Sequence, residues 1–396
     1  MKISRRSFVE TGLVLPALTN GPVSGATSPH ADSSYDPWIE IRGDNLRHNV
    51  QEVYRRAGSR PILAVIKNNG YGMGIVNVAR LLEPSAPIAG FAVIKLHEAI
   101  TLRDAGIRKP ILLMGPFDEK DLEEAVGQNI MPMVYTPLGS ILDRICGKCQ
   151  KAIPIHICID TGIGRVGVPY RQAGPLIRDL AGRKSVQIQG TMMTFTEDPD
   201  FDREQLERFR VLCNSLERDG INLGKKHAVS SFGLFQHPDA FLDMVRPGMV
   251  IYGIYPEKEF RNAGVMTLRP AISLKTRVIY VKQLRKGESA GYNRAYIAKN
   301  DVWVATLPAG HADGLPRDVV KGAQARISGK LHPIVAVSAS HCIVETGEEP
   351  RIAVGDVATL FDWQEGSRPE DVATSCASSV YDLTMHLNAL LPRRIL

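Results

Sequence analysis

Short apolar runs alternate with amphipathic stretches over the first two thirds of the chain. The clearest amphipathic stretch is residues 203–218, which places Leu206, Phe209, Cys213 and Leu216 on one helical face. The apolar runs are residues 62–67, 89–94, 110–114, 131–135, 155–160, 188–195, 227–230 and 249–252. Eight continuous apolar strands separated by helices predict a closed parallel TIM (β/α)8 barrel, because the strands of such a barrel are covered on both faces.

The pattern changes after about residue 270. Strand-like runs follow at short spacing, at residues 271–284, 302–307, 323–327, 334–337 and 357–361, and a long helix is predicted only at 381–391. We therefore expect an α/β barrel domain over residues 37–268, followed by a mostly β C-terminal domain over residues 269–396. Residues 38–41 form a further strand candidate ahead of the barrel.

The first residues predict an export signal rather than part of the fold. Ser4-Arg5-Arg6-Ser7-Phe8-Val9 has the twin-arginine pattern, and a mild apolar stretch at 12–18 and small residues at 24–26 follow it. The alternative is a chance arginine pair. The pattern predicts a signal peptide at 1–26, a linker at 27–36 and a periplasmic or exported protein. The apolar stretch is too short for a permanent membrane anchor.

Net charge and cysteine content limit the ligands and binding partners that the sequence predicts. The 396 residues carry a formal charge of +6, and removal of 1–26 leaves 45 positive and 41 negative side chains, a net charge of +4. This balance contains no basic block that would indicate nucleic-acid binding. Of six cysteines, Cys146 and Cys149 form a lone CxxC that lacks the companions of a metal site. They could form a disulfide after export or remain unpaired at a helix end.

Lys67 is the strongest candidate for chemistry. It ends an apolar run and is followed by a glycine-rich segment, so a buried strand delivers one amine to its carboxyl end. An amine placed there is poorly hydrated, which disfavours its charged form and lowers its pKa. A lysine with a lowered pKa suits a Schiff-base role. The alternative is a solvated lysine in an ordinary strand-to-helix loop.

The segment around Lys67 resembles the signature of the alanine racemase family, A-V-x-K-A-x-A-Y-G-H-G. Here it reads Ala64-Val65-Ile66-Lys67-Asn68-Asn69-Gly70-Tyr71-Gly72-Met73-Gly74. The resemblance implies that pyridoxal 5′-phosphate (PLP) is the cofactor, that Lys67 carries it, and that Tyr71 contacts its phosphate. It also implies that strand 38–41 joins the C-terminal domain.

Three further segments resemble the family in the same order along the chain. Residues 245–253 are similar to R-x-G-x-x-x-Y-G, which implies that Arg246 faces the pyridine nitrogen and that Gly248 and Met249 offer amides to the phosphate. Residues 227–233 are similar to H-x-x-N-S-x-G/A and imply a phosphate contact from Ser231, as does the late Tyr381. Residues 160–167 resemble D-T/S-G-M-x-R-x-G, which places Arg165 near the cofactor phenolic oxygen and the substrate carboxylate.

A second acid–base group is implied by residues 287–293, which resemble G-E-x-V-S/G-Y-G. Racemisation needs one group to remove the α-proton and another to return a proton from the opposite face. In this family a lysine serves one face and a tyrosine from the partner subunit serves the other. The resemblance thus implies that Lys67 and Tyr292 are the catalytic pair and that the protein is a homodimer with shared active sites. The alternative for Tyr292 is an ordinary surface tyrosine.

The chain departs from the family pattern near the expected substrate. Thr194 stands where a histidine usually stacks on the pyridine ring, and Cys158 stands where a carbamylated lysine is common. His311 replaces a tyrosine in Gly310-His311-Ala312-Asp313-Gly314, and Ala339 replaces a methionine whose amide meets the substrate carboxylate. We expect His311 and Ala339 to contact substrate and to change the size and polarity of the pocket.

The sequence therefore predicts a PLP-dependent amino-acid racemase that interconverts L- and D-amino acids, either alanine or a broader set, by a two-base mechanism. Two alternatives remain. One is a PLP-dependent retro-aldol enzyme acting on β-hydroxy amino acids, and the other is a barrel that binds PLP or another ligand without turnover.

Overall fold

The computed structural model describes residues 35–396. The predicted signal peptide, residues 1–26, and most of the linker lie outside the described residues. No helix among residues 35–396 is both long and apolar enough to cross a bilayer. Within the same range no group of histidine, cysteine or acidic side chains is arranged to hold a metal ion.

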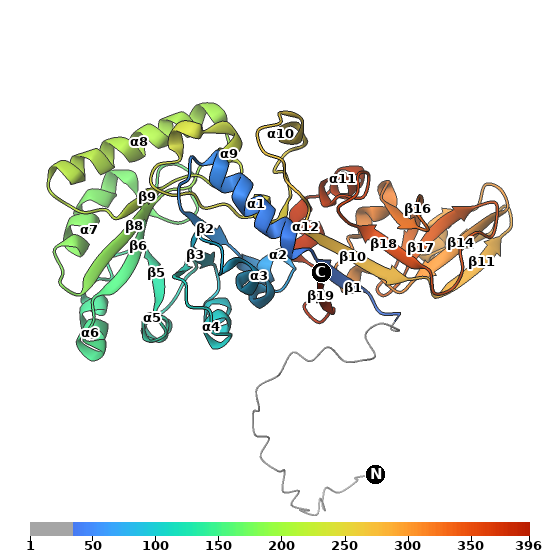
Figure 1. The fold of residues 1–396 in the computed structure, drawn as a ribbon, viewed down its shortest axis with the longest axis horizontal. Helices are drawn as coiled ribbons and strands as arrows, with labels where there is room; N and C mark the ends of the chain where they lie inside the picture. The colour runs from blue at the N-terminus through green and yellow to red at the C-terminus, as the bar shows by residue number, and fades with distance from the viewer. Residues whose placement is uncertain (1–34) are drawn as a thin grey trace, which may run out of the picture. The chain divides into compact units, whose positions relative to one another are not determined.

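Seven parallel strands and one short extended segment form the predicted barrel (Figure 1). The strands are β2 (Ile62–Val65), β3 (Ile88–Val93), β4 (Ile111–Leu113), β5 (Ile130–Val134), β6 (Ile153–Asp160), β8 (Val186–Met192) and β9 (Lys225–His227), with β7 (Val168–Pro169) beside β6. Each pairs in parallel with the next along this path. The barrel fold expected from the apolar runs is confirmed.

The eighth barrel position differs from the prediction. Residues 249–252 form the short 3-10 helix η3 (Met249–Tyr252), not a strand. The barrel is closed instead by the residues just before it: Val245 N donates to Pro61 O at 3.1 Å, and Val65 N donates to Pro247 O at 2.9 Å. A buried helical turn and a buried strand share the same apolar pattern, so periodicity could not separate them. One consequence is that Arg246 lies on the eighth strand position itself.

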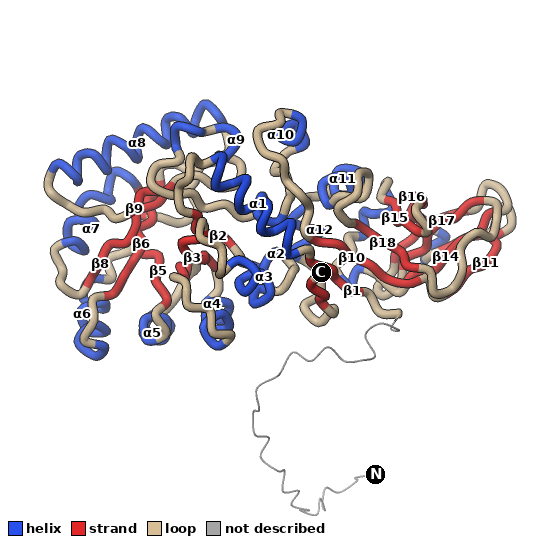
Figure 2. The backbone as a smooth tube through the Cα atoms, in the orientation of Figure 1, coloured by secondary structure: helices blue, strands red, loops and turns tan. Residues whose placement is uncertain are grey.

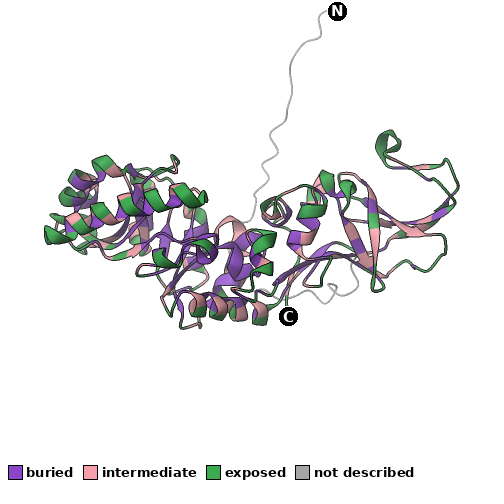
Figure 3. Ribbon diagram, turned by 90° about the horizontal axis from the view of Figure 1, so that it is seen from above, coloured by how far each residue is buried: buried purple, intermediate pink, exposed green. Residues whose placement is uncertain are grey.

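Helices cover the outside of the barrel, with their exposed faces outward (Figures 2 and 3). They are α1 (Gly43–Arg56), α3 (Ile75–Leu82), α4 (Leu96–Asp104), α5 (Glu119–Gly127), α6 (Gly139–Cys149), α7 (Tyr170–Ala181) and α8 (Pro199–Arg218). The loops of this part of the chain also contain the shorter α2 (Lys67–Tyr71), α9 (Gly233–Gln236), η2 (Pro238–Ala240) and α10 (Lys258–Asn262). The predicted helix at 203–218 is the carboxyl part of α8, which begins after the N-cap Asp198. Cys146 and Cys149 lie on α6 as free thiols.

The C-terminal region is built on one nine-stranded sheet in the order β11-β14-β17-β16-β15-β18-β10-β1-β19. These strands are β1 (Trp38–Ile41), β10 (Ile272–Arg277), β11 (Tyr280–Leu284), β14 (Val302–Leu307), β15 (Gln324–Ile327), β16 (Lys330–Val337), β17 (Cys342–Gly347), β18 (Val357–Phe361) and β19 (Arg393–Ile395). Strand β1 pairs antiparallel with β10 and parallel with β19. The first described strand thus lies in the sheet of the C-terminal region.

Two details of this region differ from the sequence prediction. The run 271–284 is split into β10 and β11, because Val278 N donates to Asp356 O while Ile279 N donates to Thr306 O, so the chain changes partners there. The predicted helix at 381–391 is only α12 (Val380–Met385); Leu387 and Leu391 stay buried in turns that continue the apolar spacing. Smaller elements are α11 (Pro369–Ser375), η5 (His311–Asp313), η6 (Arg317–Lys321) and the hairpin strands β12 (Ser289–Ala290) and β13 (Tyr296–Ile297), which flank η4 (Tyr292–Arg294).

Candidate active site

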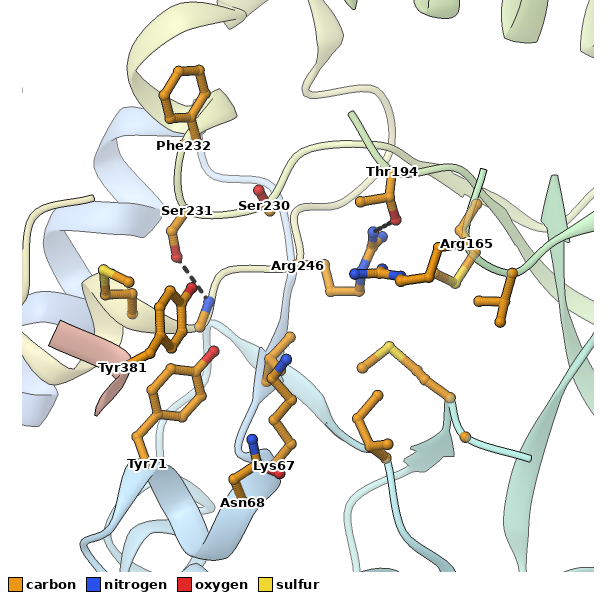
Figure 4. Close-up of a pocket in the computed structure, with 18 of the residues that line it drawn as sticks. Lys67, Asn68, Tyr71, Arg165, Thr194, Ser230, Ser231, Phe232, Arg246 and Tyr381 are labelled. Atoms are coloured by element: carbon orange, nitrogen blue, oxygen red, sulfur yellow. Dashed lines mark hydrogen bonds between the residues drawn. The ribbon is translucent and has the colours of Figure 1, made fainter. Parts of the chain in front are cut away.

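A cavity of about 520 Å³ opens at the carboxyl ends of the barrel strands, where barrels of this kind carry their chemistry. We call it the barrel cavity. Figure 4 shows side chains from widely separated segments around it. Eight of the residues singled out from the sequence line it: Lys67, Tyr71, Arg165, Ser231, Arg246, Gly248, Met249 and Tyr381.

A left-handed turn positions Lys67 and Tyr71. Residues 68–71 all have positive φ, between 53° and 62°, directly after β2. Asparagine and glycine tolerate this conformation, but it is uncommon for tyrosine and costs about 1 kcal/mol or more. Buried Glu98 on α4 holds the turn by accepting from Asn69 N at 2.9 Å, and Ile75 N donates to Asn69 Oδ1 at 3.0 Å. The amine and the phenol therefore reach the cavity from one short, fixed segment.

Burial lowers the pKa of Lys67, as the sequence predicted. Desolvation is the largest cause, the positive charge of Arg165 adds to it, and the negative charge of Glu98 opposes it. More of the amine is therefore neutral near pH 7 than for a lysine in water.

Arg246 lies deep at the wall of the cavity, with 5 % of its surface exposed. Its Nη2 donates to Met193 O at 3.0 Å and to Thr194 Oγ1 at 3.1 Å. Desolvation is the main cause that lowers its pKa to about 10, which still leaves the guanidinium charged at neutral pH. Thr194, one of the departures from the family pattern, thus acts here as a hydrogen-bond acceptor for Arg246.

Two buried histidines form a hydrogen-bonded chain that begins at Arg246. Its Nη1 lies 2.7 Å from Nδ1 of His227, whose Nε2 lies 3.0 Å from Nδ1 of His156. Burial lowers the pKa of His156 to about 4 and that of His227 well below its usual value, so both rings are neutral. Arginine can only donate, so His227 accepts at Nδ1 and donates from Nε2 to His156. The chain of bonds fixes one tautomer at each ring.

Ser231, Gly248 and two tyrosines form the wall on the other side. Ser231 Oγ accepts from Gly248 N at 3.0 Å and Val250 N at 3.4 Å. The Gly248 amide, which we expected to serve a phosphate, is therefore already bonded to the Ser231 hydroxyl. A Cβ on Gly248 would lie 2.2 Å from Tyr71 Oη, so a larger residue there would have to displace the Tyr71 phenol. Tyr71 also hydrogen-bonds to Tyr381.

Arg165 and Cys158 come from β6 and the loop after it. Asp160 shapes this loop by accepting from Gly162 N at 2.8 Å and Gly164 N at 3.2 Å. Burial raises the pKa of the Cys158 thiol to about 11, so it is neutral and supplies no negative charge to Arg165. The Arg165 guanidinium is left to bind an anion in the cavity.

Three residues expected at the site lie elsewhere in the single chain. Tyr292, with 82 % of its surface exposed, lines a separate cavity of about 270 Å³ together with Ser338 and His341. His311 and Ala339 flank this second cavity, because His311 N donates to Ser338 O at 3.1 Å and Ala312 N to Ala339 O at 2.8 Å. We call this group, Tyr292, His311, Ser338, Ala339 and His341, the tyrosine patch. His311 and Ala339 do not line the barrel cavity of their own chain, and their contact with substrate stays a prediction.

Comparison with known proteins decides the family. Residues 41–256 match the alanine racemase N-terminal domain and residues 271–395 match the alanine racemase C-terminal domain. The alanine racemase of Desulforamulus reducens is 33% identical over 366 residues, covering 90% of this chain and 98% of the relative. The chain belongs to the alanine racemase family.

Other members agree in sequence and in structure. The alanine racemase of Methanococcus maripaludis is 31% identical over 371 residues and covers 91% of this chain and 98% of its own. The solved alanine racemase of Clostridium difficile 630 has a TM-score of 0.85 at 27% identity and covers 92% of this chain and 96% of that one. As a member of the family, the protein is a PLP-dependent amino-acid racemase.

The charged and hydroxyl side chains that line the barrel cavity are suited to binding PLP. Arg165 and Arg246 bring two cations to it and Lys67 brings an amine of lowered pKa, and among the described residues neither Lys67 nor Arg165 has a carboxylate ion-pair partner. The hydroxyls of Ser231, Tyr71 and Tyr381 stand on one wall, suited to a phosphate. An anionic cofactor with a phosphate and an aldehyde carbon matches this arrangement of cations, hydroxyls and one buried amine.

Sequence reasoning missed several residues that shape the cavity. His156 had a visible signal, since it is a polar residue inside an apolar strand and is buried. Glu98 lies on an ordinary helix and Glu197 in a loop, and neither has a sequence pattern that marks it. Glu197 lines the barrel cavity.

Proposed function

We propose that this protein racemises alanine, and that Lys67 and Tyr292 are its two acid–base groups, contributed by different chains of a homodimer. The observation that carries the proposal is the buried Lys67 amine, with its lowered pKa, in a cavity that also presents Arg165 and Arg246. The exposed Tyr292 gives the reason for a dimer, since an exposed phenol on one chain can complete the cavity of another.

Each side chain of the barrel cavity has a defined task in this proposal. When bound, PLP withdraws electrons from the α-carbon of an amino acid and so eases loss of the α-proton. The Lys67 amine removes the α-proton from one face in one direction of the reaction and delivers a proton to that face in the other direction. Arg165 binds the substrate carboxylate, and charged Arg246, which is a donor only, keeps a proton off the ring nitrogen. The second proton is exchanged by the Tyr292 phenol of the partner chain.

The Lys67→Ala variant tests the proposal. We expect loss of the visible absorbance of bound PLP and a fall in α-deuterium exchange of alanine by about 10⁴-fold or more, because both the covalent link and one base are removed. The measurement is NMR of L-alanine in deuterated water. Lys95→Ala removes an exposed lysine in the loop after β3 and should leave exchange intact. Full exchange in Lys67→Ala would defeat the assignment.

We propose further that the protein is exported by the twin-arginine route. The support is the pattern Ser4-Arg5-Arg6-Ser7-Phe8 at the start of the chain. Cell fractionation tests it: replacing Arg5 and Arg6 with lysine should retain the protein in the cytoplasm, whereas replacing Lys2 with arginine should not. Equal export of both variants would contradict the proposal.

A further inference from the structure

The guanidinium of Arg246 is held by three uncharged acceptors. Its Nη2 donates to Met193 O at 3.0 Å and to Thr194 Oγ1 at 3.1 Å (Figure 4), and its Nη1 lies 2.7 Å from Nδ1 of neutral His227. Both hydrogens of Nη2 are therefore in use. Hydrogen bonds to neutral acceptors depend on direction as well as distance, so the orientation of Arg246 depends on where these acceptors are fixed.

Two of the three acceptors are fixed by the barrel strands. His227 belongs to β9, and Met193 N donates to His227 O at 3.2 Å, which continues the pairing of β8 with β9 by one residue. Thr194 comes after that pairing ends, because β8 stops at Met192 and the chain then leaves the sheet. The position of the Thr194 hydroxyl therefore has to be set by something other than a neighbouring strand.

A buried glutamine from helix α8 takes the place of that strand. Gln205 is fully buried, and its side-chain amide pairs with the backbone on both sides of Phe195. Its Nε2 donates to Thr194 O at 3.2 Å, and its Oε1 accepts from Thr196 N at 3.0 Å. Nε2 also donates to Thr161 Oγ1 at 3.1 Å, and Oε1 accepts from Thr196 Oγ1 at 3.3 Å. Two donor and two acceptor bonds use the whole capacity of the amide.

These partners fix the direction in which the Gln205 amide faces. The backbone N of Thr196 can only donate, so the oxygen of Gln205 faces Thr196 and its NH2 group faces the Thr194 carbonyl. Thr194 lines the barrel cavity, whereas Gln205 does not. A side chain outside the cavity thus holds a residue of the cavity wall by its backbone.

A second anchor holds the same loop independently of Gln205. The Oδ1 atom of fully buried Asp202 accepts from Thr196 N at 3.0 Å and from Thr196 Oγ1 at 2.9 Å. The other oxygen of Asp202 lies 2.9 Å from His237 Nε2. Loss of the Gln205 amide would therefore leave Thr196 bonded to Asp202 and would chiefly release Thr194. The stability of the loop and the orientation of Thr194 can be altered separately.

We propose that Gln205 is a positioning residue, which orients Arg246 toward the cofactor through Thr194. The inference rests on the proposed function, since it concerns how one cation of the same cavity is directed. Because both hydrogens of Nη2 bind the cavity wall, a shift of Thr194 frees one of them and lets the guanidinium of Arg246 turn.

The first test is the variant Gln205→Met, which keeps a side chain of similar length but can neither donate to Thr194 O nor accept from Thr196 N. We expect kcat for alanine racemisation to fall about tenfold and KM to change by less than about threefold, because a misplaced group lowers the rate more than it weakens binding. Gln172→Met, which alters an exposed glutamine of α7 outside the cavity, should keep both constants. The thermal midpoint checks folding, and Gln205→Glu, which keeps an oxygen toward Thr196, replaces a Gln205→Met protein that does not fold.

A double-variant cycle shows whether Gln205 acts through Thr194. Thr194→Val keeps the shape of the side chain and removes the hydroxyl that accepts from Arg246. In a chain that already carries Thr194→Val, we expect Gln205→Met to lower kcat further by less than about twofold, because both changes act on the same bond. A double variant whose loss of kcat equals the product of the two single losses would overturn the proposal.

A measurement on the apoprotein follows the guanidinium itself. In protein labelled with 15N in its arginine side chains, a guanidinium fixed by hydrogen bonds gives separate Nη signals in NMR spectra, because rotation about its Cζ–Nη bonds is slow. The signals of Arg246 are assigned by their loss in Arg246→Lys. We expect them to broaden or merge in Gln205→Met and in Thr194→Val, and to stay unchanged in Gln172→Met. Unchanged signals in Gln205→Met would overturn the positioning role.

The outcomes separate this inference from the proposed function. If the unaltered protein does not racemise alanine, the proposed function fails, while the Nη signals of the apoprotein still decide whether Gln205 holds Arg246. If the unaltered protein racemises alanine and Gln205→Met changes neither kcat nor the Nη signals, the positioning role alone is wrong.

Discussion

The barrel cavity and the tyrosine patch contain the two proposed bases of one reaction in opposite physical settings. In the cavity, burial shifts the pKa of Lys67, Arg246 and both histidines, and backbone and side-chain bonds fix the residues around them. In the patch, Tyr292 stands on a short hairpin with most of its surface exposed. The barrel cavity is formed entirely by residues of one chain, whereas the tyrosine patch is left open to solvent in the single chain.

The comparison shows that a single chain brings only one of the two proposed bases into the barrel cavity. The small cluster under the hairpin, Leu284, Ala290, Ala298, Val302 and Val304, is separate from the main core. The tyrosine patch therefore packs on a small core of its own, and no part of the same chain within residues 35–396 covers the exposed Tyr292. A second copy of the chain, applied over the patch, would supply the missing cover and bring the phenol to a lysine.

Mixing two inactive variants gives the largest expected effect. Lys67→Ala and Tyr292→Phe should each reduce alanine racemisation by about 10³-fold or more as pure proteins. Mixed, unfolded and refolded together, half of the dimers pair one chain of each kind and have one intact site, so about a quarter of the normal activity should return. Circular-dichroism assays of D-alanine formation measure it. No recovery from the mixture would contradict shared sites; Tyr296→Phe, on the same hairpin, serves as the control.

A smaller effect is expected from a substitution that crowds the wall of the barrel cavity and leaves the tyrosine patch unchanged. In Gly248→Ala the new Cβ would meet Tyr71 Oη, which costs about 1–3 kcal/mol and should weaken PLP binding about 10- to 100-fold. Titration of the apoprotein with PLP, followed by absorbance, measures the dissociation constant. Gly147→Ala, on α6 with no atom near the added Cβ, should leave PLP affinity unchanged. An unchanged PLP affinity in Gly248→Ala would contradict this prediction and show that the Tyr71 side chain can move aside at little cost.

The smallest effect concerns pH. The folded-state pKa of His156 is lowered to about 4 from 6.5, so between these values the unfolded chain binds more protons and stability falls as pH falls. The slope is about 1.4 kcal/mol per pH unit for each buried histidine. Urea unfolding between pH 7 and 4.5 measures it. His156→Asn should flatten the slope, and His386→Asn, at an exposed site, should not. Equal slopes would show that the buried pair does not carry the acid sensitivity.

Much of the barrel could be predicted because each of its strands is an apolar run bounded by turns. Lys67, Arg246 and Tyr292 could be found because a short local pattern surrounds each. The 3-10 helix after Gly248 could not, since its apolar residues are as buried as those of a strand. Glu98 could not either, because its role arises from a bond to Asn69, a residue distant in sequence, which no local pattern records.

The turn after Lys67 also touches the last residues of the chain. A Cβ on Gly72 would lie 2.2 Å from Thr384 O, and Arg393 Nε donates to Gly72 O at 2.9 Å. Tyr381 closes the same wall. Because the segment after β18 completes this wall, more than 300 residues beyond the start of the barrel, a chain in which that segment has not folded back lacks one side of the proposed coenzyme site. Loosening Arg393 from Gly72 should therefore weaken PLP binding even though Arg393 lines no part of the cavity.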